Sequence, residues 1–249
     1  MQFLDPYRNA AFSNALCRVT FCQPGGARSN LQRGRSFGRL ASTGTLMFTG
    51  IVAAIGRIER AAPRANGLRL AIDAGSLDLR DVGIGDSIAV NGVCLTVVAT
   101  SGSRFDVDVS RETIDCTAGL GATGEVNLEK SLTLADRLGG HLVSGHVDGV
   151  GEVIAFERLG DPSEENRRLV VRAPQSLAKY IARKGSITVQ GVSLTVNRVD
   201  GTEFEINLIP HTLKATTLKH LAPGARVNLE VDIIARYVER MLAAPGEAP

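Results

Sequence analysis

Residues 87–97 read SIAVNGVCLTV, and residues 186–196 read SITVQGVSLTV. Eight of the eleven positions are identical, and the offset from Gly92 to Gly191 is 99 residues. In both copies apolar residues flank an Asn-Gly or Gln-Gly step, a pattern typical of a tight β-hairpin. Two unrelated strands of similar composition do not give this agreement. The repeat therefore predicts two copies of one domain, with a functional site that is itself duplicated.

The similarity between the copies extends beyond the hairpin. FDVDV at 105–109 corresponds to FEINL at 204–208, and VNLE at 126–129 returns at 227–230. Each copy spans about 95 residues. This length suits a small independent domain and is too long for a solenoid repeat.

The composition excludes several classes of protein. The 249 residues are 44% hydrophobic, which is enough to fill two cores. A net charge of +2 indicates no polyanionic partner, and an aromatic content of 4% without Trp argues against a nucleic-acid surface. The cysteines at 17, 22, 94 and 116 form no CxxC pair, so we expect neither a metal site nor a disulfide framework. We therefore expect a cytoplasmic protein, in a reducing compartment.

No apolar run reaches the roughly 20 residues of a membrane span.

Residues 1–46 differ from the rest of the chain, because they contain six arginines and one acidic residue, Asp5. One interpretation is an organelle transit peptide, which is rich in Arg and poor in acid. The other is a mis-assigned start upstream of Met47. We favour the second, because Met47 directly precedes the first copy. In either case we expect residues 1–46 to be disordered and to lie outside the fold.

Both copies consist of short alternating segments bounded by turn residues. In the first copy the expected strands are 48–52, 68–72, 87–90, 93–99, 105–109 and 126–128. About six short strands with tight turns and no long helix indicate a small closed barrel. We therefore predict an all-β fold of two tandem six-stranded β-barrels, at 47–142 and 143–231.

A helical period follows the second copy, at residues 232–245. Its apolar stripe consists of Ile233, Ile234, Tyr237, Val238, Met241 and Leu242. This pattern predicts an amphipathic helix that has no counterpart after the first copy. The helix either packs on its own barrel or joins chains to one another. We favour an oligomerisation helix, because a single terminal apolar stripe needs a partner.

Corresponding positions of the two copies differ in their chemistry. Cys94 aligns with Ser193, and Ile51 aligns with His146. One half-site therefore has a thiol where the other has a hydroxyl, and a histidine can carry protons near neutral pH. Each residue also has a structural alternative: an inert buried thiol for Cys94, a structural hydrogen bond for His146, and a helix N-cap for Asp232.

Five motifs in combination resemble the riboflavin synthase family of the alpha-chain type, although none would suffice alone. They are MFTGIV at 47–52, GVCLTV at 92–97, GGHLVSGH at 139–146, GVSLTV at 191–196 and LIP at 208–210. The resemblance covers residues 47 to about 244. It implies two Greek-key barrels and a C-terminal helix that gathers three chains into a homotrimer. In the family, the N-terminal barrel of one chain faces the C-terminal barrel of its neighbour.

The reaction that the resemblance implies is a dismutation of two molecules of 6,7-dimethyl-8-ribityllumazine. A four-carbon unit passes between them and gives riboflavin and 5-amino-6-ribitylaminouracil, in the last step of riboflavin biosynthesis. The family uses no cofactor and no metal. Two related half-sites can hold two identical substrates against each other, which gives the duplication a chemical reason. The resemblance also leaves open an association with lumazine synthase.

The resemblance further implies which residues bind substrate. The N-terminal half-site would comprise Phe48, Gly50, Ile51, Val52, Ser87, Cys94, Leu95, Thr96, Asp108, Val109, Ser110, Arg111, Glu112 and Thr113. The C-terminal half-site would comprise Gly145, His146, Val147, Lys184, Ser193, Leu194, Thr195, Leu208, Ile209, Pro210, His211, Thr212 and Leu213. The catalytic candidates are His146, Ser193 and Asp232 for general-base help, and Cys94 or a water for addition to C7 of the acceptor.

The sequence departs from the family pattern at two positions. His211 stands where an acid is usual, and Gln190 stands where an Asp is common. The main alternative to the enzyme is a non-catalytic carrier of lumazine or flavin, which needs only one competent half-site. We favour the enzyme, because both hairpins keep their Leu-Thr pair. A flavin reductase on a similar barrel would need a nicotinamide domain, for which this sequence has no motif.

Overall fold

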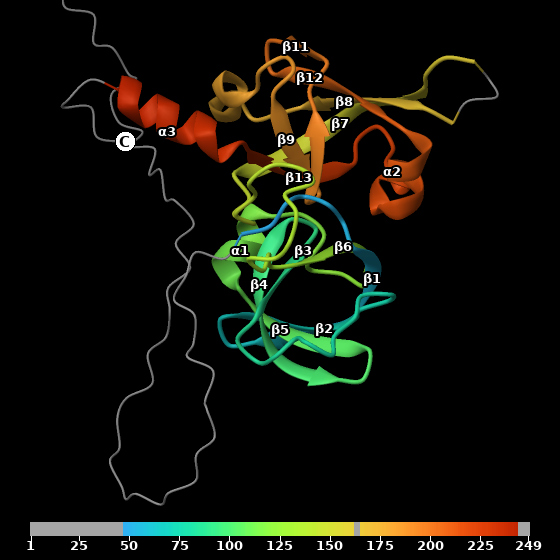
Figure 1. Cartoon of the computed structure of the whole chain (residues 1–249), viewed down its shortest axis with the longest axis vertical. Helices are drawn as coiled ribbons and strands as arrows, with labels where there is room; N and C mark the ends of the chain where they lie inside the picture. Colours follow the sequence, from blue (N-terminus) through green and yellow to red (C-terminus); the bar gives the residue numbers. More distant parts are fainter. Residues whose placement is uncertain (1–46, 162–164, 244–249) are drawn as a thin grey trace, which may run out of the picture.

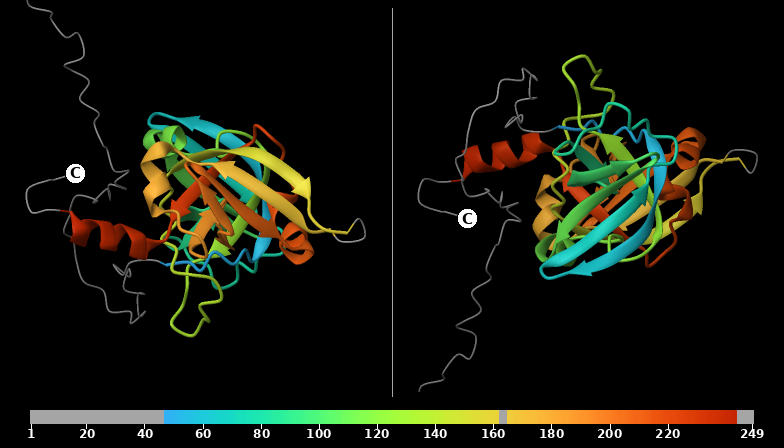
Figure 2. Two further views of the ribbon diagram at one scale, coloured as in Figure 1. Left: turned by 90° about the horizontal axis from the view of Figure 1, so that it is seen from above. Right: turned by 90° about the horizontal axis from the view of Figure 1, so that it is seen from below.

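The structure is a computed structural model that describes residues 47–161 and 165–243. In these ranges the chain forms two β-barrels that stack on each other, and the C-terminal helix α3 (Ile233–Leu242) projects from the second barrel (Figure 1). Views along the stack show α3 directed to one side of both barrels (Figure 2). The predictions for residues 1–46, including the two cysteines there, lie outside the described residues, as does the expected end of the helix at 245.

The first barrel is closed, and its strands pair in the order β1-β2-β5-β4-β3-β6. These strands are β1 (Ala54–Arg64), β2 (Gly67–Asp73), β3 (Ser87–Val90), β4 (Val93–Ser101), β5 (Arg104–Ser110) and β6 (Gly124–Lys130). The sequence RFDVDVS of β5 alternates exposed and buried side chains, so one face of the strand fills the core. Helix α1 (Arg111–Cys116) begins after Ser110, whose side chain accepts the N–H of Thr113.

The second barrel repeats this order as a curled seven-stranded sheet, β10-β9-β13-β7-β8-β12-β11. Its elements are β7 (Gly149–Arg158), β8 (Arg167–Arg172), β9 (Ser186–Val189), β10 (Val192–Thr195), β11 (Arg198–Asp200), β12 (Glu203–Leu208) and β13 (Arg226–Val231), with the short helices Gln175–Tyr180, α2 (Pro210–Ala215) and Thr217–His220. Strands β10 and β11 together correspond to β4. The break between them lies at Val196 and Asn197, and β4 has a register shift between Val97 and Ala99 at the same place. The predicted pair of barrels is therefore present, with the second one interrupted within a single strand.

Each barrel has its own apolar core, and a third small cluster lies between the barrels. The third cluster contains Phe48, Ala89 and Val143, with Cys94 packed against it. Phe48 is completely buried there. The residue that opens the first copy therefore contributes to neither barrel core.

The two repeated hairpins meet back to back. Asn91 and Gln190 have φ angles of 49° and 52°, and each is followed by a glycine with positive φ, as a type I′ turn requires. A Cβ atom on Gly92 would lie 2.8 Å from the backbone nitrogen of Gly191. Only glycine therefore permits the two turns to approach this closely.

A pair of asparagines fastens the hairpins together. Asn127 Nδ2 donates to the carbonyl of Gln190 at 2.9 Å, and Asn228 Nδ2 donates to the carbonyl of Asn91 at 3.0 Å. The two bonds cross the contact in opposite directions, so the barrels are related by a pseudo-twofold axis. The Gln190 side chain also accepts the N–H of Asn228 at 3.2 Å. This last bond lies within the second barrel, as does its counterpart in the first barrel, where the Asn91 side chain accepts the N–H of Asn127 at 2.8 Å. The side chain of Gln190 thus holds its turn to β13 of the same barrel.

Each barrel is preceded by a segment that crosses to the other barrel. We call residues 47–53 the first crossing segment and residues 143–148 the second crossing segment. The N–H of Ser193 donates to the carbonyl of Gly50 at 2.8 Å, and the N–H of Cys94 donates to the carbonyl of Gly145 at 2.8 Å. The expected strand at 48–52 is therefore wrong: this stretch forms one isolated bridge, from Phe48 to Val143, and β1 begins only at Ala54. The division of the chain into domains at residue 142 stays a prediction.

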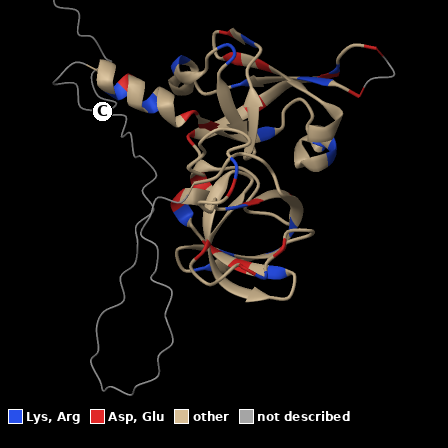
Figure 3. Ribbon diagram, viewed as in Figure 1, with Lys and Arg blue, Asp and Glu red and all other residues tan. Residues whose placement is uncertain are grey.

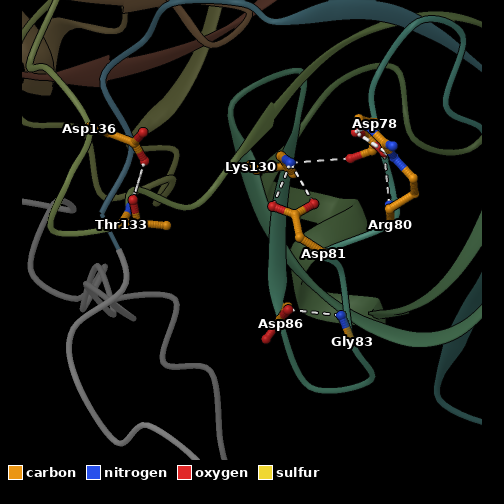
Figure 4. Close-up of polar contacts among 8 residues, drawn as sticks. All are labelled: Asp78, Arg80, Asp81, Gly83, Asp86, Lys130, Thr133 and Asp136. Atoms are coloured by element: carbon orange, nitrogen blue, oxygen red, sulfur yellow. Dashed lines mark hydrogen bonds and ion pairs between the residues drawn. The ribbon is translucent and has the colours of Figure 1, made fainter.

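Exposed polar contacts hold one loop to the first barrel and shape another loop internally (Figure 4). Lys130 Nζ lies 2.7 Å from a carboxylate oxygen of Asp81 and 3.1 Å from the carbonyl of Asp78. In the connection between the barrels, Asp136 accepts the N–H and the hydroxyl of Thr133, both at 2.8 Å. Exposed ion pairs of this kind stabilise a fold by at most about 1 kcal/mol each, so their effect is to shape the loops locally.

Positive and negative side chains are spread over both barrels, in agreement with the small net charge (Figure 3). Within the described part of the chain, no helix combines the length and apolar character needed to cross a membrane. The same residues contain no group of three or more His, Cys, Asp or Glu side chains placed to hold a metal ion.

We expect Gly92→Ala to lower the free energy of unfolding of the full chain by about 3 kcal/mol, because the new methyl group overlaps the Gly191 backbone. Gly102→Ala is the matched control, since Gly102 also has a positive φ, of 61°, but open space around it. The control should lose only about 1 kcal/mol from backbone strain. Urea denaturation measures both values, and equal losses would contradict the role of the hairpin contact.

Candidate active site

Each crossing segment lies beside the repeated hairpin of the opposite barrel, and this changes which of the predicted residues share a half-site. Gly50 lies against Ser193, where a Cβ atom on the glycine would be 2.7 Å from the serine Cβ. Gly145 lies against Cys94 in the same way, again at 2.7 Å. The sequence alone predicts the opposite grouping, with Gly50 beside Cys94 and Gly145 beside Ser193. The structure reverses it, because each crossing segment bonds to the hairpin of the opposite barrel.

Two half-sites follow from this exchange, and we name each by its central side chain. The thiol half-site contains Ser87, Cys94, Thr96, Gly145, His146 and Val147. The hydroxyl half-site contains Gly50, Ile51, Val52, His141, Lys184, Ser193, Leu194 and Thr195. Val147 packs against the first core and Val52 against the second, which confirms the exchange independently of the hydrogen bonds.

The thiol half-site holds a protonated sulfur at neutral pH. Burial raises the pKa of the Cys94 thiol, and the negative charge of Glu230 adds to the rise, although a hydrogen bond with Ser87 opposes it. The pKa of His146 is lowered by partial burial and by the positive charge of Arg236. A neutral thiol and a neutral imidazole therefore belong to this half-site.

The hydroxyl half-site contains a serine paired with a histidine. His141 Nδ1 lies 2.7 Å from Ser193 Oγ, and the backbone N–H of His141 donates to the carbonyl of Thr49 at 3.1 Å. Burial lowers the pKa of His141, and the nearby charge of Asp232 partly opposes this. His141 Nε2 is the one buried side-chain nitrogen or oxygen, among the residues that the structure describes, without a hydrogen-bond partner. A neutral imidazole beside a hydroxyl is an arrangement that can accept a proton.

His141 is not among the site residues predicted from the sequence. Its only sequence signal is its position in GGHLVSGH, and in that motif only His146 aligns with a residue of the other copy's site, Ile51. His141 lies in the connection between the barrels, outside the region where the two copies align. A comparison of the copies therefore could not reveal it.

Two buried carboxylates hold the crossing segments in place. Glu129 accepts the N–H and the hydroxyl of Thr49, both at 2.7 Å, and the N–H of Gly50 at 3.0 Å. Glu230 accepts the same three groups from Ser144 and Gly145, at 2.7, 2.6 and 3.0 Å. Both glutamates come from the repeated VNLE sequence, whose role this geometry explains.

The two carboxylates differ in their surroundings. Burial raises the pKa of Glu129 above its ordinary value. Burial raises the pKa of Glu230 to about 7, and the neighbouring carboxylate of Asp148 contributes to this rise. The second crossing segment thus depends on a group that titrates near neutral pH.

Several predicted substrate-binding residues point into the protein interior. Leu95 and Val109 belong to the first barrel core, Leu208 belongs to the second, and Phe48 lies between the barrels. Alternate residues of a strand face opposite sides, so the side chains of these residues turn away from the surface. Only their backbone groups remain available to a ligand.

The remaining candidates lie at the surface or at helix ends. Asp108 pairs with Arg69 at 2.7 Å, and Asp232 caps α3 by accepting the N–H of Ile234 at 3.0 Å. Lys184 is exposed and has a φ of 67°. Two further groups are exposed or half-buried at the starts of α1 and α2: Ser110, Arg111, Glu112 and Thr113, and Ile209, Pro210, His211, Thr212 and Leu213.

Comparisons with known proteins agree with the duplicated site. A family model described as the lumazine binding domain matches residues 49–131 and 144–232. A riboflavin synthase of Photobacterium phosphoreum is 46% identical over 198 residues, which covers 79% of this chain and 89% of that protein. A riboflavin synthase of Mycobacterium bovis is 45% identical over 207 residues, which covers 80% of this chain and all of that protein.

Solved structures with bound ligands share the fold. LumP complexed with 6,7-dimethyl-8-(1'-D-ribityl) lumazine has a TM-score of 0.63 at 26% identity, and the match covers 74% of this chain and 98% of LumP. LumP complexed with riboflavin has a TM-score of 0.64 at 28% identity over the same shares of the two chains.

We expect the free energy of unfolding to fall as the pH rises from 5 to 7, because folded Glu230 binds its proton more tightly than unfolded Glu230 does. Its pKa rises from 4.5 to about 7 on folding. The resulting stabilisation of the folded state is complete below the unfolded pKa and is lost as the pH rises to the folded pKa. The loss amounts to about 3 kcal/mol. Urea denaturation at several pH values should show a flatter profile for Glu230→Gln. Glu129→Gln is the matched comparison and should change the slope less. A wild-type slope in Glu230→Gln would contradict the assignment.

Proposed function

The chain belongs to the riboflavin synthase family, and from this we propose that it converts two molecules of 6,7-dimethyl-8-ribityllumazine into riboflavin and 5-amino-6-ribitylaminouracil. It is a transferase, because a four-carbon unit passes from one substrate molecule to the other. Every atom of the two substrates is retained in the two products. The reaction has no net oxidation and so requires no external oxidant or reductant.

The observation that carries this proposal is that the chain builds one scaffold twice and equips it differently each time. Both half-sites have the same hairpin, the same crossing backbone and the same buried glutamate. One presents the thiol of Cys94, and the other presents the pair of Ser193 and His141. A reaction between two identical molecules needs such a difference, because one of them must act as donor and the other as acceptor.

We assign proton removal to the hydroxyl half-site. The C7 methyl group of the lumazine is acidic for a C–H bond, so modest general-base help suffices. The Ser193 hydroxyl donates its hydrogen to Nδ1 of His141, at 2.7 Å, and its oxygen can then take the methyl proton. The lowered pKa of His141 leaves the imidazole neutral and able to accept. Asp232 favours the imidazolium that results, since its charge raises the pKa of this ring.

We assign acceptor binding to the thiol half-site. The raised pKa of Cys94 keeps the thiol protonated at neutral pH, so addition of a thiolate to C7 is disfavoured and addition of a water is favoured. Cys94 then acts as a weak hydrogen-bond donor that orients the ring. His146, with its lowered pKa, can carry a proton at the same half-site.

We further propose a homotrimer in which half-sites of neighbouring chains face each other. Helix α3 supports this, because its apolar side is exposed, with Ile234, Tyr237, Val238, Met241 and Leu242 all open to solvent in the single chain. Holding two substrates at facing half-sites makes their reaction effectively unimolecular. We also propose a cytoplasmic location, which rests on the cysteine pattern, and an association with lumazine synthase, which the family resemblance leaves open.

The purified full chain should form half a mole of riboflavin per mole of 6,7-dimethyl-8-ribityllumazine consumed, as followed by absorbance. Ser193→Ala and His141→Gln should each lower kcat by roughly 10²- to 10⁴-fold, the usual contribution of a general base. His220→Gln is the matched control, because His220 is exposed and pairs with Glu125. Tight lumazine binding without any riboflavin would favour a carrier over the enzyme.

We expect Met241→Glu to convert the trimer into monomers, because it puts a charge on the apolar side of α3, where Met241 is 76% exposed in the single chain. Arg240→Glu introduces the same side chain beside that stripe and should leave the mass unchanged. Sedimentation equilibrium measures both masses. A trimer that persists in Met241→Glu would show that α3 does not hold the chains together.

A further inference from the structure

Helix α3 is tied to the second crossing segment by a single guanidinium group. Nη2 of Arg236 lies 2.7 Å from Oδ2 of Asp148 and 3.3 Å from the carbonyl oxygen of His146. The same oxygen of Asp148 accepts the N–H of Val231, the last residue of β13, at 2.8 Å. The helix, the strand before it and the segment that carries His146 therefore meet at one carboxylate.

This junction exists at only one of the two half-sites. The backbone around it is the same in both copies, because Ala53 N–H donates to Leu128 and Asp148 N–H donates to Leu229, at 2.9 and 2.8 Å. The first copy, however, has Ala53 in place of Asp148, and no helix follows β6 there. The barrel fold thus forms without the Arg236–Asp148 pair, so the pair is an addition to one half-site.

The junction is well placed to act on His146. The Asp148 side chain is 14% exposed and that of Arg236 is 31% exposed, so water screens the pair only partly. Both contacts come from one nitrogen, Nη2, whose two hydrogens have fixed directions in the planar guanidinium, whereas the ammonium group of a lysine is a freely rotating point charge. Other charged groups nearby are Glu230 on β13, which holds Ser144 and Gly145, and Asp232 at the start of α3.

We propose that Arg236 is a positioning residue for the thiol half-site: it fixes the backbone at His146 and so makes the geometry of this half-site depend on how α3 is seated. The proposal rests on the proposed function for its effect on the reaction rate. Because α3 also carries the exposed apolar side, contacts made by the helix with neighbouring chains would be transmitted to His146 through this one side chain.

The test compares Arg236→Gln, Arg236→Lys and the matched control Arg240→Gln, which makes the same change on an exposed part of the same helix. Riboflavin formation gives kcat and KM. Proton NMR follows the titration of the His146 ring, identified by the signal that is lost in His146→Gln. We expect Arg236→Gln to lower kcat between about ten- and a hundredfold, as a small misplacement of a reacting group does, with little change in KM.

The lysine variant separates the charge of Arg236 from its positioning contacts, because it keeps the charge and changes the contacts. The charge of Arg236 lowers the pKa of His146, so Arg236→Gln should raise that pKa. Arg236→Lys should restore the pKa but only part of kcat. Arg240→Gln should match the wild type in both measurements. A wild-type kcat in Arg236→Gln, or a kcat fully restored by Arg236→Lys, would overturn the proposal.

A second variant covers the case in which Arg236→Gln does not fold. Asp148→Asn keeps an acceptor for the Val231 N–H but weakens the pair with Arg236, and it should lower kcat in the same way. A wild-type kcat in Asp148→Asn would also overturn the proposal. If the wild-type chain itself forms no riboflavin, the proposed function fails. The NMR titration of the His146 ring in Arg236→Gln then still shows whether Arg236 affects His146.

Discussion

Gly92 and Gly191 meet backbone to backbone at the centre of the molecule, and the remaining architecture follows from that approach. Because the turns are this close, Asn127 and Asn228 can each reach across to the opposite hairpin. Strands β4 and β10, the second strands of the two hairpins, then face the crossing segments. The N–H groups of Cys94 and Ser193 each bond to one of these segments. Each half-site is consequently assembled from both copies, and neither barrel alone contains a complete one.

The second constraint is the need to satisfy backbone donors in a segment that belongs to no sheet. Buried N–H groups require acceptors, and one glutamate in each copy supplies them. The two glutamates accept the same three groups, but the charged residues around them differ. Glu129 stands apart from other acids, whereas Glu230 lies near Asp148 and Arg236 and has the higher affinity for a proton. The crossing segments themselves also differ in chemistry, since only the second one carries a histidine, His146.

Much of the fold could be predicted from the sequence, because the repeat, the Asn-Gly step and the helical stripe of α3 are local patterns. The exchange of the crossing segments could not, because an alignment shows which positions correspond and not which barrel each one packs against. For the same reason the sequence predicts Gly50 beside Cys94, whereas the structure places it beside Ser193. Contacts at His141 depend on the connection between the copies, where no repeat guides the prediction, and the inward orientation of Leu95 follows from strand register.

The crossing segments also impose an order on assembly during translation. The second crossing segment emerges after Cys94 has been made, so Gly145 finds its partner at once. The first crossing segment must wait, because Ser193 lies 143 residues beyond Gly50. At the usual speed of synthesis this delay is on the order of ten seconds. The first barrel can close in the meantime, since Glu129 is already present to hold Thr49. The docking of residues 47–53 onto the hairpin of β9 and β10 then follows as a later step.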